Sequence, residues 1–194
     1  MRIDPITGLL LEAEFIASPN FDFRPHDQKI DLLVIHNISL PPGEFGTHKV
    51  QEFFNNELNP REHDYFKTIE HMKVSSHLFI ERTGDIFQFV PFDKRAWHAG
   101  VSSFKGQINC NDNSIGIELE GTDEIPYTIE QYEQLSLVTA CLFDAYPDMC
   151  LERVTGHSDI APERKTDPGP AFSWEMYREM VNTILDNKPI DTLA

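Results

Sequence analysis

The sequence predicts an α/β domain, of mixed α+β type, in which helices cover the faces of a β-sheet. Three observations predict this class: a continuous apolar run over residues 31–37, strict alternation over residues 114–120, and a helical apolar period over residues 129–146. A continuous apolar run is typical of a strand buried on both faces, and strict alternation is typical of a strand with two different faces. Since strand and helix patterns alternate along the chain, we expect helices packed against one sheet.

Length and composition fit one folded domain. The chain has 194 residues, 40% of them hydrophobic, and its 14 Phe can fill a sizeable core. We expect a single domain over residues 1–194, with a core at about 30–187, a frayed tail after Asn187 and a monomeric state. The chain has 16 Lys and Arg against 32 Asp and Glu, a formal charge of -16. Such a surface repels phosphate backbones and anionic lipids, so we expect neither nucleic acid nor membrane as a partner.

Cysteine usage predicts a reducing compartment. The three cysteines, Cys110, Cys141 and Cys150, are odd in number and form no CxxC pair, so a disulfide framework is not expected. The apolar run at residues 8–11 is broken by Glu12 and is unlike a signal peptide. No stretch is long enough to span a bilayer, and we expect a cytoplasmic protein.

In the first half of the chain, the patterns that indicate strands and helices are weak before residue 31 and stronger after it. We expect a short strand or hairpin arm over residues 8–17, an irregular segment over 18–28, a buried strand over 31–37, and short helices over 47–56 and 60–72. The next expected element is a β-hairpin with arms at residues 74–80 and 86–90. Gly84 suits the positive φ that its turn requires.

The second half contains the alternating strand and two capped helices. Ile115, Ile117 and Leu119 share one face of residues 114–120, while Gly116, Glu118 and Glu120 share the other. That second face either lies in solvent or points carboxylates into a site, and only one of the two Glu residues need be functional.

The helix over residues 129–146 begins at a capping box. Thr128 is its N-cap, Gln131 reaches back to it, and the helix is expected to stop before Pro147. Arg153 and Val154 form a short strand that leads into residues 155–172. Ser173 can cap a last helix.

Residues 155–172 hold a dense set of chemically useful side chains. They contain His157, Lys165 and several carboxylates beside backbone stiffened by three prolines, and we expect a loop there because Pro, Gly and polar residues exclude regular structure. A stiff loop rich in potential ligands suits a metal-centred site. Taken alone, it also fits a surface loop with solvated charges.

His36 ends the buried strand at 31–37, where side chains of a helix-covered sheet open into a crevice. Zinc binds His nitrogens and carboxylate oxygens, and a catalytic site keeps three protein ligands and a place for water. His36, His157 and Asp167 would supply such a set. The alternative for His36 is a core histidine hydrogen-bonded to a neighbour.

Two further residues complete the chemistry of a hydrolase. Glu118 is the best candidate for the general base that accepts the water proton. Lys165, two residues before Asp167, could place its ammonium beside the oxyanion of the tetrahedral intermediate. The HExxH motif of common zinc proteases is absent from the sequence.

Four segments resemble, in family order, the AmpD family of 1,6-anhydro-N-acetylmuramyl-L-alanine amidases. They are residues 33–46 (LVIHNISLPPGEFG), 90–101 (VPFDKRAWHAGV), 114–122 (SIGIELEGT) and 155–172 (TGHSDIAPERKTDPGPAF). The resemblance implies a mixed β-sheet with helices on its faces. It places zinc (Zn²⁺) on His36, His157 and Asp167, the catalytic carboxylate on Glu118 rather than Glu120, and the transition-state lysine on Lys165.

The implied reaction is hydrolysis of the amide between the lactyl group of an anhydro-muramic sugar and L-alanine, during cytoplasmic recycling of cell-wall fragments. We expect a small muropeptide substrate, contacted by Asn37, Lys73, Trp97, His98 and Arg164. Trp97 could stack on the ligand, although it could also be a core residue. In this resemblance Lys73 stands where an Arg is common.

Two rival functions remain at the level of sequence. A non-catalytic muropeptide-binding module would be expected to lose a ligand or the base, and a zinc peptidase would act on ordinary peptides.

Overall fold

A mixed six-stranded sheet forms the centre of the protein. The computed structural model describes residues 1–188. The strand order is β1-β5-β4-β9-β3-β10. The strands are β1 (Glu14–Phe15), β3 (Leu32–Ile38), β4 (Leu78–Ile80), β5 (Ile86–Gln88), β9 (Ser114–Glu120) and β10 (Val154–Gly156). Strands β4, β9, β3 and β10 are parallel, and β5 pairs antiparallel with β4 through the predicted hairpin. The mixed sheet is confirmed.

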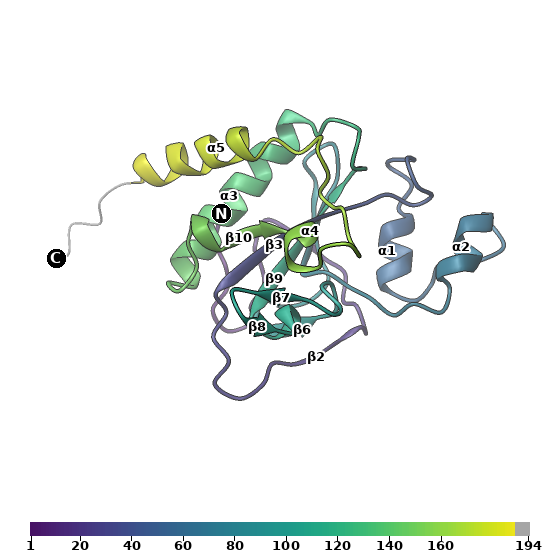
Figure 1. The fold of residues 1–194 in the computed structure, drawn as a ribbon, viewed down its shortest axis with the longest axis horizontal. Helices are drawn as coiled ribbons and strands as arrows, with labels where there is room; N and C mark the ends of the chain where they lie inside the picture. Colours follow the sequence, from purple (N-terminus) through teal and green to yellow (C-terminus); the bar gives the residue numbers. More distant parts are fainter. Residues whose placement is uncertain (189–194) are drawn as a thin grey trace.

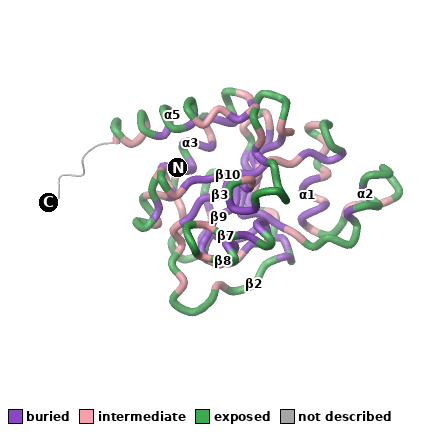
Figure 2. The backbone as a smooth tube through the Cα atoms, viewed as in Figure 1, coloured by how far each residue is buried: buried purple, intermediate pink, exposed green. Residues whose placement is uncertain are grey.

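Helices cover both faces of this sheet (Figure 1). Helices α3 (Ile129–Ala145) and α5 (Trp174–Asp186) pack over one face, where Leu135 and Tyr177 meet Leu33 and Ile117 in the main core. Helices α1 (Lys49–Phe54) and α2 (Asp64–Ile69) lie on the other side, in a second apolar cluster that includes Phe79 of β4. Figure 2 shows the result: the central strands are buried, while much of α2 and α5 is exposed.

The alternation of β9 places the functional face of the sheet. Ile115, Ile117 and Leu119 belong to the core under α3, as predicted. The other face of β9, with Glu118, therefore points away from α3 and α5. Because β3 pairs with β9 in register, with His36 opposite Glu118, the His36 side chain shares that face.

Two expectations about local structure are wrong. Residues 18–28 are not irregular throughout, since β2 (Phe21–Phe23) pairs antiparallel with β6 (Lys94–Ala96). The side chains of β2 are exposed, so no burial pattern marked it in the sequence. Its position depends on the distant partner strand, including an ion pair from Arg95 to Asp22 at 3.1 Å.

Residues 155–172 are not all loop, because α4 (His157–Ile160) begins directly after β10. The Asp159 carboxylate explains this four-residue helix: it accepts hydrogen bonds from the Gly156 N–H at 3.0 Å and the Thr155 hydroxyl at 2.9 Å. These bonds satisfy donors at the helix start. The rest of the chain adds a small hairpin, β7 (Ser103–Phe104) and β8 (Gln107–Ile108), and two 3₁₀ turns, η1 (Cys110–Asp112) and η2 (Leu151–Arg153).

The single-domain organisation and the monomeric state stay predictions, and the frayed tail expected after Asn187 falls largely on residues 189–194, outside the described part. Within residues 1–188, no helix combines the length and the apolar character needed to cross a bilayer.

The capping box of α3 gives a testable stability prediction. The Thr128 hydroxyl accepts from the Gln131 N–H at 3.2 Å, and the Gln131 side chain accepts from the Thr128 N–H at 3.1 Å. Replacing an N-cap Thr with Ala costs about 0.5–2 kcal/mol. We expect Thr128→Ala to lower the free energy of unfolding by about 1 kcal/mol in urea titrations. Thr128→Ser keeps the hydroxyl and should retain most of the free energy of unfolding. Equal losses in both variants would contradict the role of the Thr128 hydroxyl as N-cap.

Candidate metal centre

Three potential ligand atoms converge on one point at the functional face of the sheet. The Nδ1 atoms of His36 and His157 lie 2.9 Å apart, and the Asp167 Oδ2 atom lies 3.0 Å and 3.1 Å from them. All three residues are buried. The three positions that the sequence predicted as zinc ligands therefore meet in space, although 131 positions separate the first from the last.

The sheet positions both histidines. Strand β10 pairs with β3 so that Gly156 lies opposite Ile35. The next residues along these parallel strands, His157 and His36, are therefore brought side by side. The start of α4 at His157 then redirects the chain, so that residues 161–172 return over the edge of the sheet.

The loop that carries Asp167 is fixed from both sides. The Asp167 carbonyl accepts from the Ser158 N–H at 3.0 Å. The next carbonyl, that of Pro168, accepts from the Tyr127 hydroxyl at 2.8 Å and from the Asn37 amide at 3.1 Å. The Asp167 carboxylate is therefore held in place by its backbone, which lowers the entropy cost of using it as a ligand.

The protonation states suit a cation. Burial lowers the pKa of His36 to about 4, against the contact with Asp167, which raises it. The ring is therefore neutral at pH 7. Two imidazole nitrogens and one carboxylate oxygen are a standard donor set for a divalent metal.

The geometry fits a tetrahedral zinc ion. Bonds of about 2.0–2.1 Å to a tetrahedral ion place ligand atoms about 3.3 Å apart, close to the three distances found here. His157 also has its other nitrogen, Nε2, 3.0 Å from the Ala99 carbonyl. Since a carbonyl can only accept, Nε2 carries the proton and the Nδ1 lone pair points to the centre.

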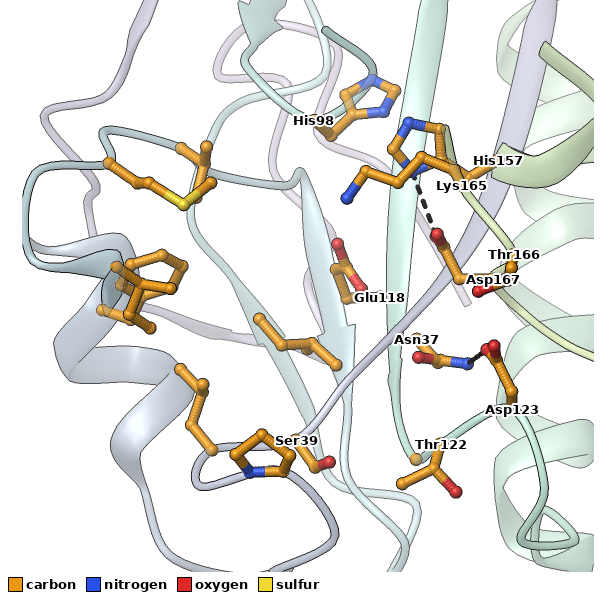
Figure 3. A pocket seen from close by; sticks show the side chains of 18 of the residues that line it. Asn37, Ser39, His98, Glu118, Thr122, Asp123, His157, Lys165, Thr166 and Asp167 are labelled. Carbon is orange, nitrogen blue, oxygen red and sulfur yellow. Dashed lines mark hydrogen bonds and ion pairs between the residues drawn. The ribbon is translucent and has the colours of Figure 1, made fainter. Parts of the chain in front are cut away.

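Glu118 and Lys165 lie beside this centre (Figure 3). Glu118 Oε1 is 4.0 Å from His36 Nδ1, and Glu118 Oε2 is buried without a hydrogen-bond partner. Burial, and then the negative charge of Asp167, raise the pKa of Glu118 well above its usual range. Lys165 is exposed and extends its ammonium over the same space. A buried carboxylate with a raised pKa is typical of a general base or acid.

Glu120, the other carboxylate on this face of β9, has a structural position. It is buried, and it accepts from the backbone N–H groups of Gly46 at 2.5 Å and Arg82 at 3.2 Å. These bonds tie β9 to two loops. Only one of the two strand carboxylates therefore faces the candidate metal centre.

The centre opens into a cleft of ≈ 570 Å³ between the sheet, helices α1 and α2, and residues 121–124 and 164–167. One wall is apolar and includes Leu40, Phe53, Phe54, Ile69 and Met72. The opposite side is polar and includes Asn37, Asp123, Lys165 and Thr166. Such a site suits a ligand with one apolar or sugar-like part and one charged part.

The predicted substrate contacts differ in their positions. Trp97 lines the cleft, half-buried, and its stacking role stays a prediction. Lys73 is exposed and is not among the cleft-lining residues, although its neighbours Met72 and Val74 are.

The remaining three have protein partners of their own. The Asn37 amide donates to Asp123 at 2.9 Å as well as to the loop of Asp167. Arg164 Nη2 donates to the carbonyls of Ala99 and Val101, both at 2.7 Å. Both ring nitrogens of His98 have partners within 3.1 Å.

Three residues that hydrogen-bond to the predicted site residues were not predicted from the sequence. Asn111 and Ser114 contact His98, and Asp123 contacts Asn37. One available signal was Gly116, since a glycine inside a buried strand often marks the close approach of another group. A Cβ at this position would lie 2.4 Å from the His98 ring.

Comparison with known proteins places these features in one family. Residues 26–170 match the family described as N-acetylmuramoyl-L-alanine amidase. The chain is 55% identical over 175 residues to the 1,6-anhydro-N-acetylmuramyl-L-alanine amidase AmpD of Escherichia coli (strain K12), which covers 90% of this chain and 95% of that protein.

Solved structures agree with the sequence match. A crystal structure of a selenomethionine derivative of AmpD superposes with a TM-score of 0.90 at 54% identity, covering 93% of this chain and 99% of the other. A complex of the amidase AmiD from E. coli with anhydro-N-acetylmuramic acid-L-Ala-D-gamma-Glu-L-Lys superposes with a TM-score of 0.57 at 27% identity, covering 86% and 67%.

Proposed function

Because the chain belongs to the N-acetylmuramoyl-L-alanine amidase family, we propose that it hydrolyses the amide bond between the lactyl group of 1,6-anhydro-N-acetylmuramic acid and L-alanine, using zinc held by His36, His157 and Asp167. The observation that carries this proposal is the convergence of these three ligand atoms beside a buried, unpartnered Glu118 carboxylate.

The residues of the chain divide the reaction between them. A zinc ion bound at the three ligands would supply a Lewis acid that lowers the pKa of water and polarises the amide carbonyl. Glu118 accepts the proton of the attacking water and then delivers it to the leaving amine of L-alanine. Lys165 stabilises the negative charge that develops on the carbonyl oxygen.

The cleft supports a muropeptide as substrate. Its apolar wall and Trp97 suit the faces of an anhydro-sugar, and its polar side suits a short peptide. Arg164 and Lys73 remain proposed partners for the carboxylates of the stem peptide. We also propose that the protein acts as a monomer. The free state of Cys110, Cys141 and Cys150 supports a cytoplasmic location.

A product assay separates this function from its rivals. Purified protein should release free peptide from a defined anhydro-muropeptide, lose this activity after chelation, and recover it with zinc. Tight binding without turnover would favour a non-catalytic binding module. Cleavage of ordinary peptides at a comparable rate would favour a zinc peptidase.

A further inference from the structure

The segment His98–Ala99 contacts both histidines of the metal centre from behind. We infer that this segment, held by Asn111, is a bracket that fixes the orientation and the tautomer of His36 and His157. His98 and Asn111 are then positioning residues rather than substrate contacts. The inference rests on the proposed function only for the identity of the metal.

Asn111 holds the backbone of the bracket. Its buried Oδ1 atom accepts hydrogen bonds from two consecutive N–H groups, that of His98 at 3.1 Å and that of Ala99 at 2.8 Å. Two bonds to one side-chain oxygen fix the direction of the Ala99 carbonyl and the His98 side chain together.

The Ala99 carbonyl fixes His157. It accepts from His157 Nε2 and also from Arg164 Nη2, so the imidazole is anchored on the side opposite the metal position. The proton on Nε2 leaves the Nδ1 lone pair free.

The His98 ring fixes His36 through a chain of hydrogen bonds that has only one consistent direction. The chain ends at the Cys110 carbonyl, which can only accept, so the Ser114 hydroxyl donates to it. The Ser114 oxygen then accepts from His98 Nε2 at 3.1 Å.

With its proton on Nε2, His98 offers the lone pair of Nδ1 to His36 Nε2, 2.9 Å away. His36 therefore carries its proton on Nε2 and directs the lone pair of Nδ1 to the centre.

The bracket thus sets up a site that is complementary to a cation. The Nδ1 atoms of both rings, the nitrogens that the bracket leaves without a partner on its own side, point to one position beside the Asp167 carboxylate. A divalent cation at this position would be bound by two nitrogens and one carboxylate oxygen, each held in place before the ion arrives. Groups behind the ligands that fix a tautomer in this way typically change metal affinity by about 10–100-fold when they are removed.

The backbone of β9 is shaped to admit the His98 ring. Gly116 lies against this ring, and a Cβ there would lie 2.4 Å from His98 Cγ and 2.5 Å from Nδ1. His98 lines the cleft, but the residue is only 9% exposed, which leaves little surface for a substrate.

The test compares zinc affinity, by competition with a chelator, in the full-length protein and its variants. His98→Ala and Asn111→Ala should bind zinc about 10–100-fold more weakly than the unmodified protein. His98→Asn places an acceptor near the position of Nδ1, and Asn111→Asp keeps the accepting oxygen, so both should recover most of the affinity. Val181→Ala, a core truncation in α5, should lower the melting temperature and leave zinc affinity unchanged.

Several outcomes would refute the inferred role of the segment His98–Ala99. Unchanged zinc affinity in His98→Ala together with a raised KM would make His98 a substrate contact. Equal losses in His98→Ala and Val181→Ala would mean general destabilisation. Where His98→Ala does not fold, Ser114→Ala serves instead, since it keeps the His98 ring and removes the acceptor for His98 Nε2 together with the donor to the Cys110 carbonyl.

Nitrogen-15 NMR of the zinc-loaded protein gives a second readout. It should find the protons of His36 and His157 on Nε2, and protons on Nδ1 would refute the inference. This readout does not depend on turnover. The proposed function fails separately if the zinc-loaded protein releases no peptide from an anhydro-muropeptide.

Discussion

Replacing Glu118 with Gln should lower kcat by roughly 10²–10⁴-fold while leaving one zinc per chain. Glu118 is the one carboxylate on β9 that faces the candidate metal centre. Its Oε2 atom has no hydrogen-bond partner in the described structure, so it is free to take a proton from water. A Gln side chain keeps the shape of Glu118 and removes its basicity. Steady-state kinetics on an anhydro-muropeptide, with metal analysis of the same sample, measures both quantities.

Glu120→Gln is the matched control on the same strand. Glu120 accepts two backbone N–H groups, so its replacement should reduce stability and leave turnover within about tenfold of the unmodified protein. Loss of zinc from Glu118→Gln, or full activity in that variant, would contradict the role of Glu118 as general base.

The same Glu118→Gln variant should be more thermostable than the unmodified protein when both are metal-free. Burial raises the pKa of Glu118, so keeping its charge in the folded state costs stability above the ordinary carboxyl pKa of about 4.3. The cost grows as pH rises through that value and disappears below it. The difference in melting temperature should therefore be present at pH 7 and vanish at about pH 4. A higher melting temperature in Glu118→Gln would show that the variant is folded, so misfolding would not explain its lost activity.

Replacing Asp167 with Ala should empty the metal site and abolish turnover. Asp167 supplies the only carboxylate among the three converging ligand atoms, and its charge offsets that of the metal. Because changes behind the ligands already cost about 10–100-fold in metal affinity, removal of a ligand should cost more than 100-fold. Metal analysis after dialysis, and titration with zinc in the presence of a competing chelator, measure the loss.

Glu163→Gln is the control for this variant. Glu163 is an exposed carboxylate in the same stretch, outside the metal cluster and the cleft lining, so its replacement should leave zinc binding unchanged. Full zinc stoichiometry in Asp167→Ala would remove Asp167 from the ligand set.

The parts of the fold that were predictable carry strong local signals. The apolar run of β3, the alternation of β9 and the capping box of α3 each depend on neighbouring residues alone, and each was confirmed. Strand β2 and helix α4 were missed because both are very short. The strand depends on its partner β6, and the helix on hydrogen bonds to the Asp159 side chain.

The residues of the site also differ in how well the sequence predicted them. Donor chemistry suggested His36, His157 and Asp167 as ligands with Glu118 beside them, the resemblance of four segments to a known family strengthened that prediction, and these side chains do converge. The substrate contacts were harder to predict, because a polar residue near a site can face either the ligand or the protein. Asn37, Arg164 and His98 each have hydrogen bonds to other parts of the chain, which no local pattern records.

The sequence by itself therefore determined the fold class and the strand that presents Glu118, because burial patterns are properties of the residues themselves. It also indicated the three potential metal ligands, through their donor chemistry together with the resemblance of the surrounding segments to a known family. Only the tertiary structure decided how those ligands are held. The register between β3, β9 and β10 brings His36, Glu118 and His157 together, and Asn111 sets the backbone that contacts both imidazoles. Those relations join residues far apart in the chain, so they exist only after the sheet has formed.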